Sequence, residues 1–141
     1  MQNESCAMKI STDKKHVFVV DDDESVCDAL GILLGTYGFI VRTFTSAADF
    51  LRVVPDNAPG CLILDIHMPE LDGWATLQRI RGSGSGRPVI MITADKNGGF
   101  REKSGEAGAA GFLQKPFNDQ ELVDLIRDTF TKTERVKQDS G

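Results

Sequence analysis

The sequence lacks an apolar stretch long enough to cross a membrane, and it has few cysteines. No apolar run approaches the roughly 18 residues of a membrane-spanning helix, and residues 1–15 contain neither an apolar signal segment nor a small-residue cleavage site. Cys6, Cys27 and Cys61 form an odd, widely spaced set, which indicates neither a disulfide framework nor a CxxC metal site. These absences favour a cytoplasmic protein that does not contact the membrane.

Positive charge is also in the minority. The 141 residues include 16 Lys and Arg against 21 Asp and Glu, which gives a net charge of -5. One basic cluster, Lys132, Arg135 and Lys137, lies in a polar C-terminal segment. This balance argues against direct nucleic-acid binding by the bulk field of the domain.

The length and composition bound the organisation of the chain. With 40% hydrophobic residues, 141 residues suffice for one compact core and are too few for two comfortable ones. We therefore expect a single domain over residues 15–130. A flexible N-terminal tail is expected over 1–14, and a polar C-terminal tail or the start of a linker over 131–141.

Five apolar runs recur along the chain, with helical patterns between them. The runs cover residues 16–20, 39–44, 61–65, 88–93 and 109–114. Four are almost continuously apolar, as buried strands are, whereas Arg42 and Thr43 interrupt the second run and suit an edge strand. Alternating strands and helices predict an α/β fold, a doubly wound parallel sheet. Glycines weaken the helix expected before the last strand, which should be short and comparatively mobile.

Polar side chains follow the predicted strands at the edge where ligands bind in such sheets. They are Asp21 and Asp22 after the first strand, Asp65 at the end of the third, Thr93 at the end of the fourth and Lys115 after the fifth. Helix capping explains Asp23 and Glu24, but it does not explain Asp65. An incidental acidic rim is the alternative to a functional cluster.

Three clustered carboxylates repel one another unless a cation joins them. Oxygen ligands with incomplete protein coordination suit Mg²⁺, which keeps waters and accepts a phosphate oxygen. Lys115 would add a fixed positive charge and Thr93 a hydroxyl. The set is therefore typical of a site that holds a transferring phosphoryl group against a carboxylate.

The motifs VVDDDES, LDIHMPELDG, PVIMITA and GFLQKPF, in this order and spacing, resemble the receiver domain of two-component response regulators over roughly residues 15–130. The resemblance implies a flavodoxin-like sheet in the order 2-1-3-4-5 with five helices. It also implies a role for each site residue: Asp65 as phosphoacceptor, Asp21, Asp22, Asp65 and the backbone carbonyl of His67 as Mg²⁺ ligands, Thr93 as switch hydroxyl, Lys115 as phosphoryl contact and Phe112 as rotating aromatic. A cis Lys115–Pro116 bond is expected with it.

The same resemblance implies a signalling function. A sensor histidine kinase or phosphotransfer protein would donate a phosphoryl group to Asp65 with Mg²⁺, after which Thr93 moves inward and Phe112 turns. The domain would catalyse only its own phosphorylation and dephosphorylation and would not be an enzyme acting on other substrates. We expect the fourth helix, fifth strand and fifth helix, about residues 97–130, to signal to a downstream protein or a covalently linked effector domain. Phosphorylation-dependent homodimerisation through this face stays open.

Two alternative functions stay open beside the signalling function. One is a receiver-like interaction scaffold that works without phosphorylation. The other is a Mg²⁺-dependent phosphatase with an aspartyl-phosphate intermediate. Such a phosphatase would require an aspartate at the position of His67. The His67 imidazole itself either faces solvent or overhangs the phosphoryl group and tunes its hydrolysis. Cys27 falls on a helix position that could face solvent, and Trp74 is expected to be a partly buried helix residue.

Overall fold

The computed structural model describes residues 15–96 and 98–140, with side chains described as far as Lys132. Five parallel strands form one sheet in the order β2-β1-β3-β4-β5, which confirms the predicted topology. The strands are β1 (His16–Val20), β2 (Ile40–Phe44), β3 (Cys61–Asp65), β4 (Val89–Thr93) and β5 (Gly111–Gln114). The helices in the described part are α2 (Glu24–Thr36), α3 (Ala47–Val53), α4 (Gly73–Gly82), α5 (Phe100–Glu106) and α6 (Asp119–Ser140).

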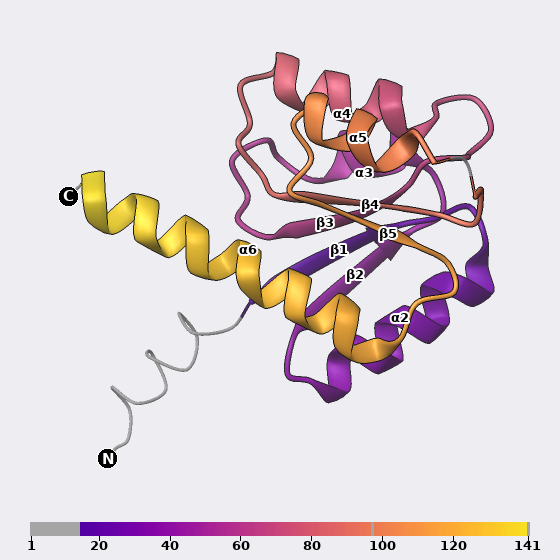
Figure 1. Cartoon of the computed structure of the whole chain (residues 1–141), viewed down its shortest axis with the longest axis horizontal. Coiled ribbons are helices and arrows are strands. Elements are labelled where there is room, and N and C mark those ends of the chain that lie inside the picture. Colours follow the sequence, from indigo (N-terminus) through magenta and orange to yellow (C-terminus); the bar gives the residue numbers. More distant parts are fainter. Residues whose placement is uncertain (1–14, 97, 141) are drawn as a thin grey trace.

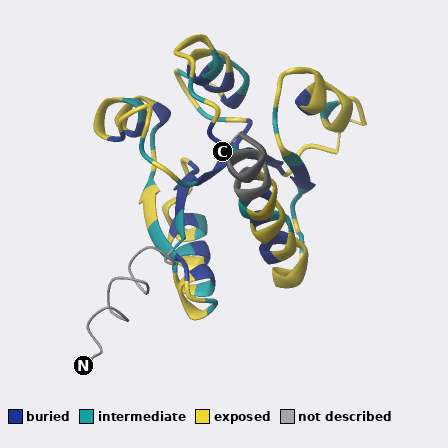
Figure 2. Ribbon diagram, turned by 90° about the vertical axis from the view of Figure 1, so that its left-hand side faces the viewer, coloured by how far each residue is buried: buried dark blue, intermediate teal, exposed yellow. Residues whose placement is uncertain are grey.

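Helices cover both faces of the sheet, with α2 and α6 on one face and α3, α4 and α5 on the other (Figure 1). Successive residues of a strand point to opposite faces, so each strand contributes to two cores. On β1, Val17 and Val19 pack with the α2 and α6 side chains, whereas Phe18 and Val20 pack with those of α3 and α4. The strands β3 and β4 are therefore buried along their whole length and are apolar up to their last residues, Asp65 and Thr93 (Figure 2).

The strand β2 forms one edge of the sheet, as Arg42 and Thr43 predict. It pairs only with β1, and both of these polar side chains are exposed. The helix α5 is short, as its glycines predict, and Ser104 is its one buried residue.

Side-chain caps fix where several helices begin. Ser46 accepts a hydrogen bond from the backbone of Asp49, and Asp72 accepts one from Ala75. Asn118 and Glu121 each accept a bond from the other's backbone N–H, which forms a capping box at the start of α6. These caps place the helices directly after the loops that leave the carboxyl ends of the strands.

The backbone of α6 continues as a helix to Ser140, through the segment expected to be a polar tail or the start of a linker. The expected tail over 1–14 lies outside the described residues. No helix in the described part of the chain is long and apolar enough to span a membrane.

Candidate functional site

Three carboxylates meet at the carboxyl edge of the two central strands. Because β1 and β3 pair in parallel, with Val20 opposite Leu64, the next residues of both strands emerge side by side. One carboxylate oxygen from each of Asp21, Asp22 and Asp65 lies within 4.8 Å of the others. Asp21 and Asp65 are buried, at 1% and 5% exposure, whereas Asp22 is exposed. The cluster thus has a buried floor and an opening to solvent.

Lys115 brings a positive charge into this cluster from the far side of the sheet. Its backbone N–H donates to the Thr93 carbonyl at 2.7 Å, and the bond to Pro116 is cis, as expected. Its Nζ lies 2.7 Å from Asp21 Oδ2 and 3.9 Å from Asp65 Oδ1. The lysine is therefore placed to contact both carboxylates or a group bound between them.

The charge of the cluster is only partly compensated. Burial and the neighbouring charge of Asp21 raise the pKa of Asp65 to about 6, although Lys115 opposes this shift. An added divalent cation would relieve that repulsion, and carboxylate oxygens with an open face suit Mg²⁺. The donor set therefore fits the metal implied by the sequence, with Asp21, Asp22 and Asp65 as its side-chain ligands.

Thr93 ends β4 beside this cluster and is fully buried. Its Oγ1 accepts a hydrogen bond from the backbone N–H of Asp95 at 3.0 Å. The Asp95 carboxylate in turn lies 3.2 Å from His67 Nε2, with both side chains about half exposed. The His67 imidazole therefore contacts the Asp95 carboxylate, which lies on another loop. The two sequence-based predictions for His67, facing solvent or overhanging the phosphoryl group, did not include this contact. The spacing of residues in the sequence did not indicate this contact, because it depends on the shapes of the loops that follow β3 and β4.

Phe112 lies apart from the carboxylates, inside the core formed with α3 and α4. It is 8% exposed and pairs in register with Met91, two residues before Thr93. The Arg101 guanidinium lies 5.1 Å from the centre of its ring. The predicted switch aromatic is thus buried in this structure and is contacted from α5.

Cys27 corrects one expectation, because its side chain is buried at 2% exposure rather than facing solvent. Its thiol donates to the Asp21 carbonyl at 3.2 Å and lies 3.5 Å from the Phe44 carbonyl. Burial, followed by the charge of Asp21, raises the pKa of the thiol. Cys27 faces inward because it shares the apolar stripe of α2 with Leu30 and Leu34.

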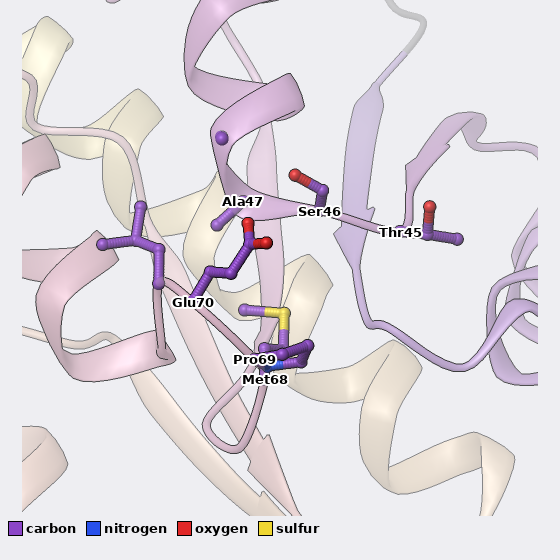
Figure 3. Close-up of a pocket in the computed structure, with 8 residues that line it drawn as sticks. Thr45, Ser46, Ala47, Met68, Pro69 and Glu70 are labelled. Carbon is purple, nitrogen blue, oxygen red and sulfur yellow. The ribbon is translucent and has the colours of Figure 1, made fainter.

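A separate cavity of about 150 Å³ lies where the loop after β2 meets the loop after β3. Its lining includes Ser46, Met68 and Glu70 (Figure 3), and Glu70 has a left-handed backbone with φ of 68°. None of the three carboxylates of the cluster lines it. The cavity is therefore a neighbour of the predicted site and not part of it.

Comparison with known proteins decides the family. Residues 17–127 match the family described as the response regulator receiver domain. This chain is a response regulator receiver domain. The match runs from the second residue of β1 into the first half of α6 and includes every residue of the predicted site.

Relatives of this receiver include two longer regulatory proteins. It is 35% identical over 134 residues to the transcriptional regulatory protein FixJ of Bradyrhizobium diazoefficiens, covering 91% of this chain and 65% of FixJ. It is 38% identical over 111 residues to the response regulator protein TodT of Pseudomonas putida, covering 79% of this chain and 49% of TodT. The receiver thus spans about half to two thirds of these curated relatives.

Solved structures agree with this fold. Full-length FixJ from B. japonicum superimposes with a TM-score of 0.81 at 34% identity, over 89% of this chain and 62% of that one. The response regulator StyR gives a TM-score of 0.78 at 37% identity, over 90% and 67%. The sheet and its helices are thus those of known response regulators.

Proposed function

We propose that Asp65 is the phosphoacceptor of this receiver and that Mg²⁺ assists the transfer. The observation that carries the proposal is the gathering of Asp21, Asp22 and Asp65 within 4.8 Å, with Lys115 Nζ 3.9 Å from Asp65. Asp65 ends β3, the middle strand of the sheet, between β1 and β4. The backbone carbonyl of His67 is a further candidate ligand for the metal.

The chemistry follows from charge. A carboxylate oxygen of Asp65 forms a bond to phosphorus while the phosphorus–nitrogen bond of a phosphohistidine donor breaks, and the donor imidazole keeps that electron pair and gains a proton. Bound Mg²⁺ would supply the positive charge that lets an anionic nucleophile approach an anionic phosphoryl group. Lys115 then contacts the transferred group, and the Thr93 hydroxyl donates to it.

The output is proposed to pass through α5, β5 and α6, about residues 97–130. Inward movement of Thr93 would open space for Phe112 to turn, and Phe112 already contacts Arg101 of α5. A short helix with one buried residue is a good candidate for the element that moves. The surface would then bind a downstream protein, a linked effector domain or a second copy of the chain.

The proposed phosphoryl transfer also indicates the protein partners. A sensor histidine kinase or phosphotransfer protein supplies the phosphoryl group in the cytoplasm. The relatives extend well beyond the receiver, and FixJ is named a transcriptional regulatory protein, which supports a linked effector domain as the output. Binding of nucleic acid would then belong to that effector and not to this domain.

The proposal is tested by the intact mass of the chain after incubation with acetyl phosphate, with and without Mg²⁺. One phosphoryl adduct is expected, dependent on the metal, in the unmodified chain and in the matched control Asp56→Asn, whose side chain is exposed in a loop. Asp65→Asn should give no adduct. An adduct that survives Asp65→Asn would refute the assignment. A folded chain that takes no phosphoryl group from acetyl phosphate or from a phosphohistidine donor would instead support the alternative function, an interaction scaffold that works without phosphorylation.

A further inference from the structure

The helix α5 is attached to the rest of the domain by few contacts. Ser104 is its one buried residue. The Ser104 Oγ has no hydrogen-bond partner among the described residues. The ring contacts of this helix with other elements come from Phe100, Arg101 and Lys103, near its beginning.

Phe100, the first residue of α5, contacts both ends of the segment that follows the phosphoacceptor. Its ring centre lies 5.6 Å from that of His67, two residues after Asp65. It lies 5.7 Å from that of Trp74, in an edge-to-face arrangement at 67°. Lys103, one turn further along α5, places its Nζ 4.4 Å from the Trp74 ring centre. The β3–α4 segment thus holds α5 through aromatic contacts.

This attachment is distinct from the one through Phe112. Arg101 points to Phe112 on β5, whereas Phe100 points to the segment after β3. The imidazole of His67 is also bound to Asp95, whose backbone donates to Thr93 Oγ1. A shift of the loops around the carboxylates therefore reaches α5 by two separate side chains.

We propose that Phe100 is a second mechanical link between the phosphorylation site and α5, acting through His67 and Trp74. The inference rests on the proposed function for its biological meaning, because the link would carry the phosphorylation signal. The link itself exists in the unphosphorylated chain. It can therefore be tested without any phosphoryl transfer.

The first test is a double-mutant cycle on amide hydrogen exchange of α5 in the unphosphorylated chain. His67→Ala should speed exchange in α5 by about threefold, the size expected for one lost ring contact. In the Phe100→Leu background, the same His67→Ala change should have little further effect. His16→Ala, at the other histidine, and Phe130→Leu, at a ring that stacks on Phe39, are the matched controls. Neither control should change α5 exchange.

The second test follows the signal with the single tryptophan of the chain as reporter. Phosphorylation by acetyl phosphate should change the fluorescence emission of Trp74 and the amide exchange of α5. This change is expected both in the chain without substitutions and in Phe130→Leu. Phe100→Leu should accept the same amount of phosphate, measured by intact mass, yet show less than half of the α5 response. Comparing the adduct and the response separates transfer from coupling.

The outcomes distinguish the two claims. Additive effects of His67→Ala and Phe100→Leu, or no effect of His67→Ala on α5, would overturn the link. A full α5 response in phosphorylated Phe100→Leu would overturn it as well. Absence of any adduct in the chain without substitutions, with acetyl phosphate and with a phosphohistidine donor, would instead refute the proposed function. The double-mutant cycle would still decide whether the link exists.

Discussion

Lys115 Nζ is bound to Asp21 rather than to Asp65, at 2.7 Å against 3.9 Å. The lysine therefore neutralises one of the carboxylates that the proposed metal would use. Because a Lys ammonium and Mg²⁺ are attracted to the same oxygens and repel each other, they compete at this edge of the sheet. Binding of the metal would free Lys115 to turn toward the transferred group on Asp65.

This competition predicts that Lys115→Met binds Mg²⁺ more tightly. We expect the affinity to rise by about fivefold, which corresponds to about 1 kcal/mol of removed repulsion and lost ion pairing. Isothermal titration with Mg²⁺ measures it directly, with Lys132→Met as the control because Lys132 is exposed on α6. Phosphoryl uptake should fall in spite of the tighter metal. Weaker Mg²⁺ binding by Lys115→Met would show that the lysine organises the site for the metal.

The raised pKa of Asp65 predicts how stability depends on pH in the absence of metal. Its pKa is about 6 in the folded chain against 3.8 as the ordinary value, because of burial and the charge of Asp21. The folded state thus holds this proton more tightly than the unfolded state does. The stabilisation is fully present below the ordinary pKa and is lost as the pH rises through the folded pKa.

Asp65→Asn cannot ionise, so it should escape this loss. We expect its free energy of unfolding to exceed that of the chain without substitutions by about 2 kcal/mol near pH 8, and the difference to vanish as the pH falls below about 4. Urea unfolding in EDTA across this range makes the comparison, with Asp56→Asn as an exposed control. A difference that stayed constant with pH would mean that packing, rather than ionisation of Asp65, separates the two chains.

The sequence was sufficient to predict which residues meet at the site. Asp21, Asp65 and Thr93 each follow or end an apolar run, and parallel strands bring their carboxyl ends to one edge. The strand order was implied by the resemblance to receiver domains, and the polar residues inside the second run agree with its place at an edge. The position of a residue along a strand can therefore be predicted from the sequence alone.

The sequence was not sufficient to predict which groups these side chains contact. Lys115 could reach either carboxylate, and only its path from the loop after β5 decides for Asp21. The contact of His67 with Asp95 depends on the shapes of two loops. These are three-dimensional properties that spacing alone does not contain.

Gly73 is expected to be essential for the position of Asp65. A Cβ at this residue would lie 2.6 Å from the Asp65 carbonyl oxygen and 2.7 Å from the Ile66 Cα, both backbone atoms that cannot move cheaply. Gly73→Ala should therefore destabilise the chain by about 2 kcal/mol and slow phosphoryl uptake. Gly82→Ala is the matched control, since it changes the last residue of the same helix, where a Cβ meets nothing within 4 Å. Equal behaviour of the two variants in urea unfolding and in uptake would refute this role.

Arg87 should stabilise the fold without taking part in the chemistry. It is 6% exposed, and its guanidinium donates to the carbonyls of Pro55 and Ala58, each at 2.8 Å, on the loop that leads into β3. It also lies over the Phe18 and Phe50 rings, at 5.3 and 5.4 Å. Arg87→Met would keep much of the apolar packing. It would remove the guanidinium donor from the Ala58 carbonyl and one of the two donors from the Pro55 carbonyl, which also accepts from the Ala58 backbone N–H at 3.1 Å.

We expect Arg87→Met to lower the free energy of unfolding by about 3 kcal/mol. Arg52→Met, at an exposed arginine of α3, should change it by less than about 0.5 kcal/mol. Phosphoryl uptake by folded Arg87→Met should be unchanged, because Arg87 precedes β4 at the amino edge of the sheet whereas Asp65 and Thr93 lie at the carboxyl edge. Urea unfolding and intact mass give the two readouts. Loss of uptake in a chain that is still folded would mean that the loop held by Arg87 communicates with the carboxylates through β3.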